Sequence, residues 1–501
     1  MAEARRGSFI AAASVLAIVT AVLMVPVIAF GQDATSEAAD QNNFHLPVIR
    51  TMAEQWPRID VVHYNSATAP GFHVVMSTVV KLGVDGVRPL RLVGSVFTLA
   101  MLLAAWWPAA RIAGPWTGLI LVAPLVASSY VLGAGIWLTT DNLALLFVLL
   151  ALAGALGPPT MRRLALCALA AAAAVCVRQI HVWSVGAAMV AAFIATPWGA
   201  RLVTRLGALP GDARTSIGNG DVLAAGGARA WAARPLPVVA IAIALCLPLA
   251  VVAIWFGLWG SLTPPALATK HDAGIRTVTP TMMLAVAAGF AGPLLAAVIA
   301  GPAPRTSLAR VLAAPGPWGM AVAAGALSIL PPSTYDQAAG RWGGAIWELV
   351  RRTPAVGGRS LVLIAGAAAG AWCLTHAWLA LRAAGRGREA LILAASMAGW
   401  AAAQSFNSET WQRYAEPLTL AVAAWIGAML VAEIRRRAVG AATDGAVGGA
   451  TGVATGVATG VAGARSGVRA DRGWWAGPAI LVVVQLALLA ITLYRPVFGG
   501  A

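Results

Sequence analysis

Residues 40–71 read DQNNFHLPVIRTMAEQWPRIDVVHYNSATAPG and lie between two long apolar segments, one ending near Phe30 and the next beginning near Arg91. Polar residues gather at the start of this stretch, where Asp40 and His45 flank Gln-Asn-Asn-Phe. No other stretch of the chain places so many polar residues ahead of a long series of apolar segments. We therefore interpret the rest of the chain as a scaffold that holds this stretch over a few other polar residues at a membrane surface.

The composition is that of a membrane protein. Of the 501 residues, 59% are hydrophobic and only 11% are charged, which is too apolar for a soluble domain of this length. Runs of roughly 18–24 apolar residues recur, and each can cross the hydrocarbon core as a helix. Helices are expected because backbone groups in lipid must be hydrogen-bonded within their own segment. The sequence therefore predicts an all-α polytopic membrane protein in contact with the lipid bilayer.

About thirteen segments are predicted to span the membrane. They lie near residues 8–30, 91–109, 116–134, 141–157, 163–178, 181–198, 236–258, 279–300, 315–331, 360–381, 389–405, 416–434 and 474–494. The shortest, 141–157 and 315–331, fit tilted or re-entrant segments. Residues 8–30 are too long for the core of a signal peptide and are interpreted as a retained first span.

Arginine placement predicts the orientation of the chain. The net charge of +16 comes mostly from arginine, and in a membrane protein it indicates cytoplasmic loops and anionic headgroups rather than nucleic acid. With the N-terminus in the cytoplasm, nearly every inner loop is basic, as the positive-inside rule requires. The exception is the outer loop 332–359, which is predicted to hold a helix lying on the surface.

This orientation brings the unusual polar residues to the outer face. They are Asp40 and His45, Thr140 and Asp141, Arg178 with Gln179 and His181, Thr263, the Lys270-His271-Asp272 triplet, and Asn407, Gln412, Arg413, Tyr414 and Glu416. The spans are almost free of ionisable groups, whereas a transport path would place such groups near the bilayer midplane. Chemistry at one surface is therefore favoured over transport through the middle.

Each of these residues also has a purely structural interpretation, which the sequence leaves open. Asp40 can be a solvated loop carboxylate, and His45 can cap or pack the following helix. Asp141 suits the N-cap of its span, and Arg178 can extend to a lipid headgroup. The charged pair in QRYAEP (412–417) can be a simple ion pair. The shared location of these residues, and no single one of them, favours a site.

A sugar donor linked to a lipid phosphate explains the set. Its prenyl chain remains in the bilayer, while its phosphate and sugar lie at the interface. The leaving phosphate needs cations, for which Arg178, His271 and Arg413 are candidates. The acceptor hydroxyl needs a base, and Asp40 is the best-placed carboxylate of the first outer loop. No Asp-x-Asp pair stands in an outer loop to hold a metal, so neither a metal nor another cofactor is expected.

The two ends of the opening stretch resemble a known signature. DQNNFHLP (40–47) and SATAPG (66–71) are similar to the D-E-x-F-H-x-P and T-T-x-P-G motifs in the first lumenal loop of the dolichyl-phosphate-glucose-dependent α-1,2-glucosyltransferases. Those enzymes add the last glucose to a lipid-linked oligosaccharide. Aligning Phe44 and His45 puts Gln41 and Asn42 where the family has Asp and Glu, so that Asp40 is one residue early.

Later segments keep the same order as in that family. LRLVGSVF (90–97) resembles its L-R-F-V-N segment, and LTTDNLALLF (138–147) resembles its Y-T-D segment. VRQIHVW (177–183) is similar to F-R-Q-T-N-I-x-W, with His181 in place of Asn, and QRYAEP (412–417) resembles a late Arg-Tyr motif.

The resemblance implies a membrane glycosyltransferase of the GT-C architecture. A hexose, glucose in the family, would pass from a polyprenyl or dolichyl phosphate to a glycan or lipid-linked acceptor with inversion at the anomeric carbon, Asp40 taking the proton of the acceptor. The residues implied to bind substrate are His45, Thr68, Pro70, Gly71, Arg91, Asp141, Arg178, Gln179, His271, Arg413, Tyr414 and Glu416. The alternatives are a GT-C transferase of another sugar, such as mannose or arabinose, and a flippase or transporter for lipid-linked sugars.

Three parts of the chain are expected. Residues 1–434 form the GT-C-like domain, with a first outer loop at 31–90, and residues 474–501 form the last span and a short tail. Residues 435–473 contain the repeat TGVATGVATGVAG and are predicted to be a flexible cytoplasmic linker. The Ala-, Arg- and Gly-rich composition suggests a bacterial plasma membrane, with the endoplasmic reticulum as the eukaryotic counterpart, and an extracytoplasmic or lumenal site.

Overall fold

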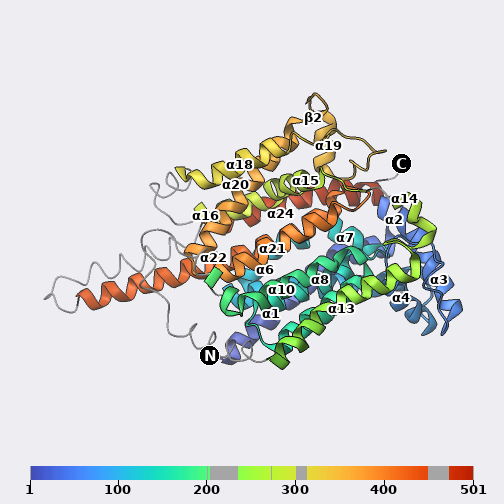
Figure 1. The fold of residues 1–501 in the computed structure, drawn as a ribbon, viewed down its shortest axis with the longest axis horizontal. Coiled ribbons are helices and arrows are strands. Elements are labelled where there is room, and N and C mark those ends of the chain that lie inside the picture. The colour runs from blue at the N-terminus through green and yellow to red at the C-terminus, as the bar shows by residue number, and fades with distance from the viewer. Residues whose placement is uncertain are drawn as a thin grey trace.

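In a computed structural model of the protein, the described residues are 2–199, 201–202, 235–271, 274–300, 313–449 and 473–499. They form a bundle whose long helices run back and forth along one direction (Figure 1). The sheet in this part of the chain is a hairpin of β1 (Ala355–Val356) and β2 (Arg359–Ser360). The protein is an all-α polytopic membrane protein.

A helix or broken helix occupies each predicted span. In chain order these are α1 (Ala2–Phe30), α5 (Val87–Ala113), α6 (Pro115–Val126) with α7 (Ser129–Ile136), α8 (Asp141–Leu156), α9 (Met161–Val177), η2 (Gln179–Ser184) with α10 (Val185–Ile194), α13 (Pro235–Trp259), α15 (Thr279–Val286) with η4 (Ala287–Ala291) and α16 (Gly292–Ala300), α18 (Pro315–Leu327), α20 (Leu361–Ala383), α21 (Gly387–Gln404), α22 (Gln412–Gly449), and α24 (Ala476–Leu489) with η5 (Ala490–Tyr494) and α25 (Arg495–Phe498). Within the described ranges, seven helices are long and apolar enough to cross a membrane, or eight if the bent pair α6–α7 is one span. The other helices at predicted spans are shorter or less apolar.

The predicted span 116–134 is broken rather than straight. Helices α6 and α7 meet at an angle of 74°, and the break falls at Ala127 and Ser128. Pro124, in the last turn of α6, has no N–H to continue the helical hydrogen bonds. The Ser128 hydroxyl donates a 2.7 Å hydrogen bond to Glu416, which fixes the bend against α22. The predicted short span 141–157, in contrast, is one unbroken helix, α8.

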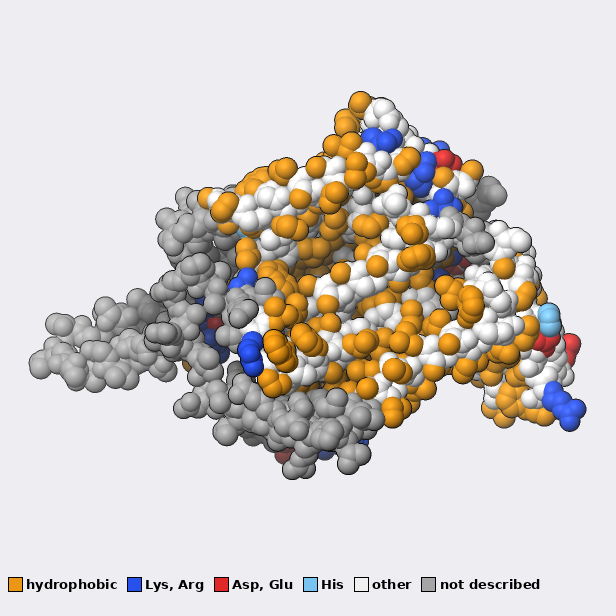
Figure 2. All heavy atoms as spheres, viewed as in Figure 1, with side chains coloured by type: hydrophobic (Ala, Val, Ile, Leu, Met, Phe, Trp, Pro, Cys, Tyr) orange, Lys and Arg blue, Asp and Glu red, His pale blue; other side chains and the backbone are white. Residues whose placement is uncertain are grey.

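The lateral face of the bundle is apolar. Figure 2 shows hydrophobic side chains over the middle of the visible helices, while the visible charged side chains lie toward the two ends. This distribution matches a bilayer core bounded by two polar interfaces.

Arginines from the predicted inner loops close helix ends at one end of the bundle. Arg388 donates hydrogen bonds of 2.8 Å to the carbonyl oxygens of residues 155–157. Arg435 donates to the carbonyl oxygen of Ala113 at 2.9 Å. The last carbonyl groups of α8 and α5 are thereby satisfied by cations, which also suits the negative ends of these helices.

The opposite end carries short helices. The predicted first outer loop holds α2 (Ser36–Asp40), the π-helical turn η1 (Gln41–His45), α3 (Leu46–Gln55) and α4 (Gly71–Lys81). Nearby are η3 (Pro265–Leu267), α14 (Ala268–His271) and α19 (Ala345–Arg352). Helix α19 is the helix expected in loop 332–359, and its Trp347 is fully buried.

One boundary differs from the expected one. Helix α22 continues to Gly449, past position 435, where the flexible linker was predicted to begin. Most of that predicted linker, residues 450–472, lies outside the described part of the chain.

Candidate active site

A cavity of about 330 Å³ lies at the end of the bundle that carries the short helices. Its polar wall includes Asp40, His45, Thr68, Asp141, Arg178, Gln179, Asn407, Glu409, Arg413 and Tyr414. Its apolar wall includes Ile180, Val182, Val252, Leu262, Leu267 and Phe406. Segments far apart in the sequence therefore converge here, as the predicted orientation requires.

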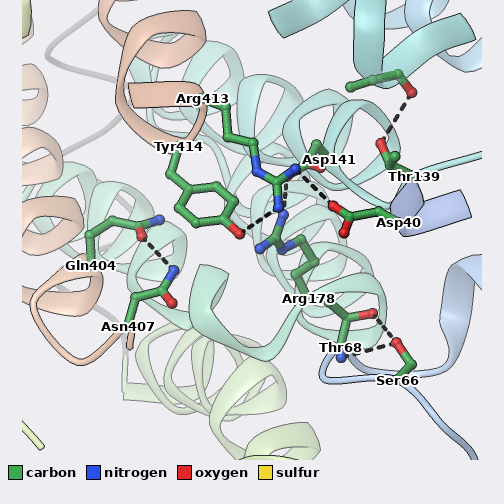
Figure 3. A network of polar contacts seen from close by, with 11 residues as sticks. Asp40, Ser66, Thr68, Thr139, Asp141, Arg178, Gln404, Asn407, Arg413 and Tyr414 are labelled. Carbon is green, nitrogen blue, oxygen red and sulfur yellow. Dashed lines mark hydrogen bonds and ion pairs between the residues drawn. The ribbon is translucent and has the colours of Figure 1, made fainter. Parts of the chain in front are cut away.

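Arg413, at the start of α22, is the centre of the polar wall (Figure 3). Its Nη1 donates to Asp40 at 2.9 Å, and its Nη2 donates to the Tyr414 hydroxyl at 3.1 Å. Its guanidinium lies 3.9 Å from the centre of the Trp411 ring. Its Nε is buried and has no hydrogen-bond partner among the described residues. Contacts with Asp40, Tyr414 and Trp411 therefore fix the Arg413 side chain, and they leave its Nε–H donor unused.

Arg178 forms the second charged pair. It follows the end of α9 and donates to the carboxylate of Asp141, the first residue of α8. A carboxylate at this position also suits the positive end of the helix. The Arg178 guanidinium lies 4.8 Å from the centre of the Tyr414 ring, so Tyr414 contacts both arginines from one side. Each arginine is paired with one aspartate, so an entering anion has to compete with a carboxylate for an arginine.

The π-helical turn η1 explains how Asp40 reaches the cavity. The N–H of Leu46 bonds to the carbonyl oxygen of Gln41, five residues earlier, so the turn holds one residue more than an α-helical turn. Asp40 and His45, also five residues apart, consequently both line the cavity. Gln41, which aligns with the family's Asp, is instead fully buried beneath the turn. The one-residue offset of the motif is thus absorbed by the backbone.

Gln179 fixes the SATAPG loop (66–71) against the cavity. Its Oε1 accepts from the N–H of Ala69 at 3.0 Å, and its Nε2 donates to the carbonyl oxygens of Ala67 and Leu262 at 2.9 Å. A Cβ on Gly71 would lie 2.6 Å from the carbonyl oxygen of Cys176, so the close approach of α4 to α9 requires glycine. Pro70 and Gly71 shape the loop and do not line the cavity.

Two other predicted site residues lie outside the cavity. Arg91 is only 4% exposed, donates to Gln41 at 2.9 Å and Asp33 at 2.8 Å, and lies 4.1 Å from the centre of the Trp137 ring. Glu416 is fully buried and accepts hydrogen bonds of 2.7–2.8 Å from Ser128, Gln412 and Gln485. The partner of Arg413 is Asp40, so the ion pair considered for QRYAEP is not the one the structure forms. The side chain of His271 lies outside the described part of the chain.

Sequence analysis did not assign several residues of the site, among them Glu409, Trp411 and His73. Glu409 and Trp411 line the cavity, and His73 lies beneath it, in contact with His45. Trp411 and Tyr414 stack with ring centres 5.6 Å apart, three residues apart at the start of one helix. Proximity to the Arg-Tyr motif was the available signal for Trp411, but a tryptophan at a span end is also common at membrane interfaces.

Comparison with known proteins gives little beyond the fold. No family model and no curated protein matches the sequence. Two solved structures of ArnT from Cupriavidus metallidurans are similar, each at 14% identity over 98% of this chain. The apo structure gives a TM-score of 0.44 over 78% of that chain, and the structure bound to undecaprenyl phosphate gives 0.46 over 77%. The chemistry of the cavity therefore has to be inferred from its own residues.

Proposed function

We propose that the protein is a membrane glycosyltransferase that moves a hexose from a polyprenyl phosphate to a hydroxyl group of a glycan acceptor. The observation that carries this proposal is the meeting of two arginine–aspartate pairs in one cavity at an end of an apolar bundle. Such a cavity offers cations to a phosphate, a carboxylate to a hydroxyl, and an apolar wall to a prenyl chain.

Donor binding would rearrange the charged pairs. A sugar phosphodiester carries one negative charge, and a guanidinium can hold two of its oxygens at once. Arg413 has an unused Nε and is paired with Asp40, so the entering phosphate competes with that carboxylate. Asp40 is released as the phosphate binds, and the base becomes available only when the donor is in place.

The transfer step follows from these positions. The acceptor oxygen attacks the anomeric carbon and gives its proton to Asp40. The bond between the anomeric carbon and the phosphate oxygen breaks, and its electron pair remains on that oxygen. Arg178 and Arg413 stabilise the additional negative charge. Attack from the face opposite the phosphate inverts the anomeric carbon, with no covalent enzyme intermediate and no metal or other cofactor.

Glucose and an α-1,2 linkage are the specific proposals. They rest on the resemblance of DQNNFHLP, SATAPG and VRQIHVW to the glucosyltransferase motifs. Mannose and arabinose donors are the alternatives. An extracytoplasmic site is proposed from the arginine distribution, with the polyprenyl phosphate of a bacterial plasma membrane as carrier.

The experiment is transfer from synthetic polyprenyl-phosphate-glucose by the purified protein in detergent, with the mannose and arabinose donors in parallel. Release of polyprenyl phosphate that depends on an added glycan acceptor supports the proposal, and the preferred donor identifies the sugar. Movement of intact donor across proteoliposomes, without release of sugar from any donor, would favour the flippase alternative.

The side of the membrane is tested separately by labelling single cysteines in intact cells. Arg58, in the first loop, and Val439, near the opposite end of α22, are both exposed, Val439 at 65%. A cysteine at position 58 should react with an impermeant reagent, and one at position 439 should react only after permeabilisation. The reverse pattern would contradict the proposed orientation.

A further inference from the structure

Two histidines meet beneath the cavity wall. His45 ends the π-helical turn η1, and His73 is the third residue of α4. The Nδ1 of His45 lies 3.0 Å from the Nε2 of His73, and the ring planes differ by 26° with centres 5.2 Å apart. His45 lines the cavity, while His73 is fully buried. A contact this short between two ring nitrogens requires one proton between them.

The surroundings of His73 restrict where its own proton lies. Its ring packs against Phe72 and Tyr64, with ring centres 5.8 and 6.0 Å away. Its Nδ1 is buried without a hydrogen-bond partner in the described part of the chain. Its Nε2, in contact with His45, is therefore the ring nitrogen with a polar partner.

Both rings are neutral at neutral pH. Burial lowers the pKa of His45 to about 4, although the Asp40 and Asp141 carboxylates oppose this shift and Arg178 and Arg413 reinforce it. Burial, together with the neighbouring His45, also lowers the pKa of His73 well below its usual value. Each ring therefore carries a single N–H, and the contact allows two arrangements.

The two arrangements differ in what they bury. If His45 donates to His73, the proton of His73 must be on Nδ1, where it is a buried N–H without a partner. If His73 donates from Nε2, that unpaired N–H does not exist and only a lone pair remains on Nδ1. In the protein backbone, buried N–H groups without a partner are rarer than carbonyl acceptors without one, and we apply the same preference to the imidazole ring. The second arrangement is favoured, and it places the proton of His45 on Nε2, the nitrogen left for the cavity.

We propose that His73 is a positioning residue that fixes His45 in the neutral Nε2–H tautomer, so that His45 donates a hydrogen bond to an oxygen of the bound sugar phosphate. This inference rests on the proposed function for the identity of the ligand. The opposite tautomer would present a lone pair beside Asp40, as a second proton acceptor. The fixed tautomer gives the two neighbours complementary roles, Asp40 accepting a proton and His45 donating to the substrate.

The tautomer is measurable without substrate by nitrogen-15 NMR of the full-length protein, labelled at histidine, in lipid nanodiscs. The signal of His45 is assigned by its loss in His45→Gln. We expect a protonated Nε2 and an unprotonated Nδ1 at neutral pH, and a mixture of tautomers in His73→Leu. A protonated Nδ1 or an imidazolium in the wild-type protein would overturn the inference.

Kinetics test the role of His73. His73→Leu keeps an apolar side chain in the buried site but removes the donor, and we expect kcat to fall roughly 10–100-fold, the loss seen for residues that orient metal-binding histidines. His73→Gln keeps an N–H donor near the former Nε2 and should restore most of the activity. His63→Leu, an exposed histidine of the same loop, is the matched control and should behave as wild type. Equal activity of His73→Leu and His73→Gln would show that the donated hydrogen bond is not used.

Binding measurements on His73→Leu identify which oxygen of the donor accepts the hydrogen bond from His45. Weaker binding of both polyprenyl phosphate and polyprenyl-phosphate-glucose indicates a phosphate oxygen, and weaker binding of the second alone indicates a sugar hydroxyl. Unchanged binding of both ligands would contradict the hydrogen bond from His45 to the donor. If the wild-type protein transfers sugar from none of the donors, the proposed function is contradicted. The tautomer of His45 can still be measured in that case, because the NMR experiment needs no substrate. A protonated Nδ1 with intact transfer would overturn only this inference.

Discussion

Two arginine clusters at the end of the bundle that carries the short helices use the same residue types differently. The Arg91 clamp consists of Arg91, Asp33, Gln41 and Trp137, and the cavity cluster consists of Asp40, Asp141, Arg178, Arg413 and Tyr414. Asp40 and Gln41 are neighbours in the sequence, yet one belongs to the cavity cluster and the other to the clamp.

The difference lies in what the guanidinium groups can still bind. In the clamp, Arg91 has its Nε and Nη2 paired and its face covered by Trp137, and it does not line the cavity of the candidate site. In the cavity cluster, both arginines border open space, and the Nε of Arg413 has no partner in the described residues. Access, and not residue type, separates a structural arginine from one that can bind an anion.

The largest expected effect is that of Asp40→Asn. Loss of the proton acceptor should reduce transfer roughly 10²–10⁴-fold. Binding of the donor should survive and strengthen, because Arg413 loses a competing carboxylate. Transfer of labelled glucose and binding of the donor are measured separately in detergent. Asp33→Asn changes the same residue type in the clamp and should keep the specific activity of the wild type.

Asp141→Asn decides between the two carboxylates of the cavity cluster. If Asp141→Asn is inactive while Asp40→Asn retains near-normal turnover, the base is Asp141. If neither variant loses activity, the transferase proposal fails.

The second prediction concerns the leaving phosphate. Arg178→Lys and Arg413→Lys keep the charge but lose the planar fork that holds two oxygens. A hydrogen bond to a charged group contributes about 1.5–3 kcal/mol, so each variant should lose about 10–100-fold in kcat/KM, with normal expression. Titration of the donor shows how much of the loss is in binding. Wild-type kinetics in Arg178→Lys would make it a purely structural residue, like Arg91.

Arg91→Lys tests the other side of the comparison. The clamp joins the loop that holds Asp33 and Gln41 to α5 and to the end of α7, so its loss should lower the free energy of unfolding by roughly 1–3 kcal/mol. The specific activity of the folded fraction should stay within a few-fold of wild type. Thermal unfolding and transfer are measured on the same preparation. A folded, inactive Arg91→Lys would mean that the clamp belongs to the site.

The helices were predictable from sequence because apolar runs are a local signal. The all-α membrane fold is confirmed, and Asp40, His45, Asp141, Arg178 and Arg413 line one cavity. Which arginine faces the cavity was not predictable, since that depends on packing between segments hundreds of residues apart.

The offset of Asp40 shows the same limit at short range. A motif alignment assumes that residues with the same spacing in the sequence occupy the same positions in space. On that assumption Gln41 takes the position of the family's Asp. The π-helical turn η1 holds an extra residue, which returns Asp40 to the side of His45. Only the backbone hydrogen bonds reveal this shift, since no residue type specifies a π-helical turn.

The last prediction concerns pH, and it compares the cavity cluster, which His45 and His73 flank, with the clamp, which contains no histidine. Unfolded histidine titrates near pH 6.5, whereas folded His45 has a pKa of about 4 and that of His73 is lowered well below 6.5. Between these values the unfolded state binds more protons, so stability falls as the pH is lowered from about 6.5 toward 4, by at most about 1.4 kcal/mol per pH unit for each histidine. Above about pH 6.5 the pair adds no pH dependence.

Thermal unfolding of wild type, His73→Gln and Arg91→Lys across this window checks the sign. His73→Gln removes one of the two groups and should flatten the decline of stability on acidification. Arg91→Lys should lower stability at every pH without changing the slope, because the clamp contains no histidine. Parallel curves for wild type and His73→Gln would mean that His73 is not held neutral by burial. The argument that fixes the tautomer of His45 would then lose its premise, while the roles of Asp40 and the two arginines would stand.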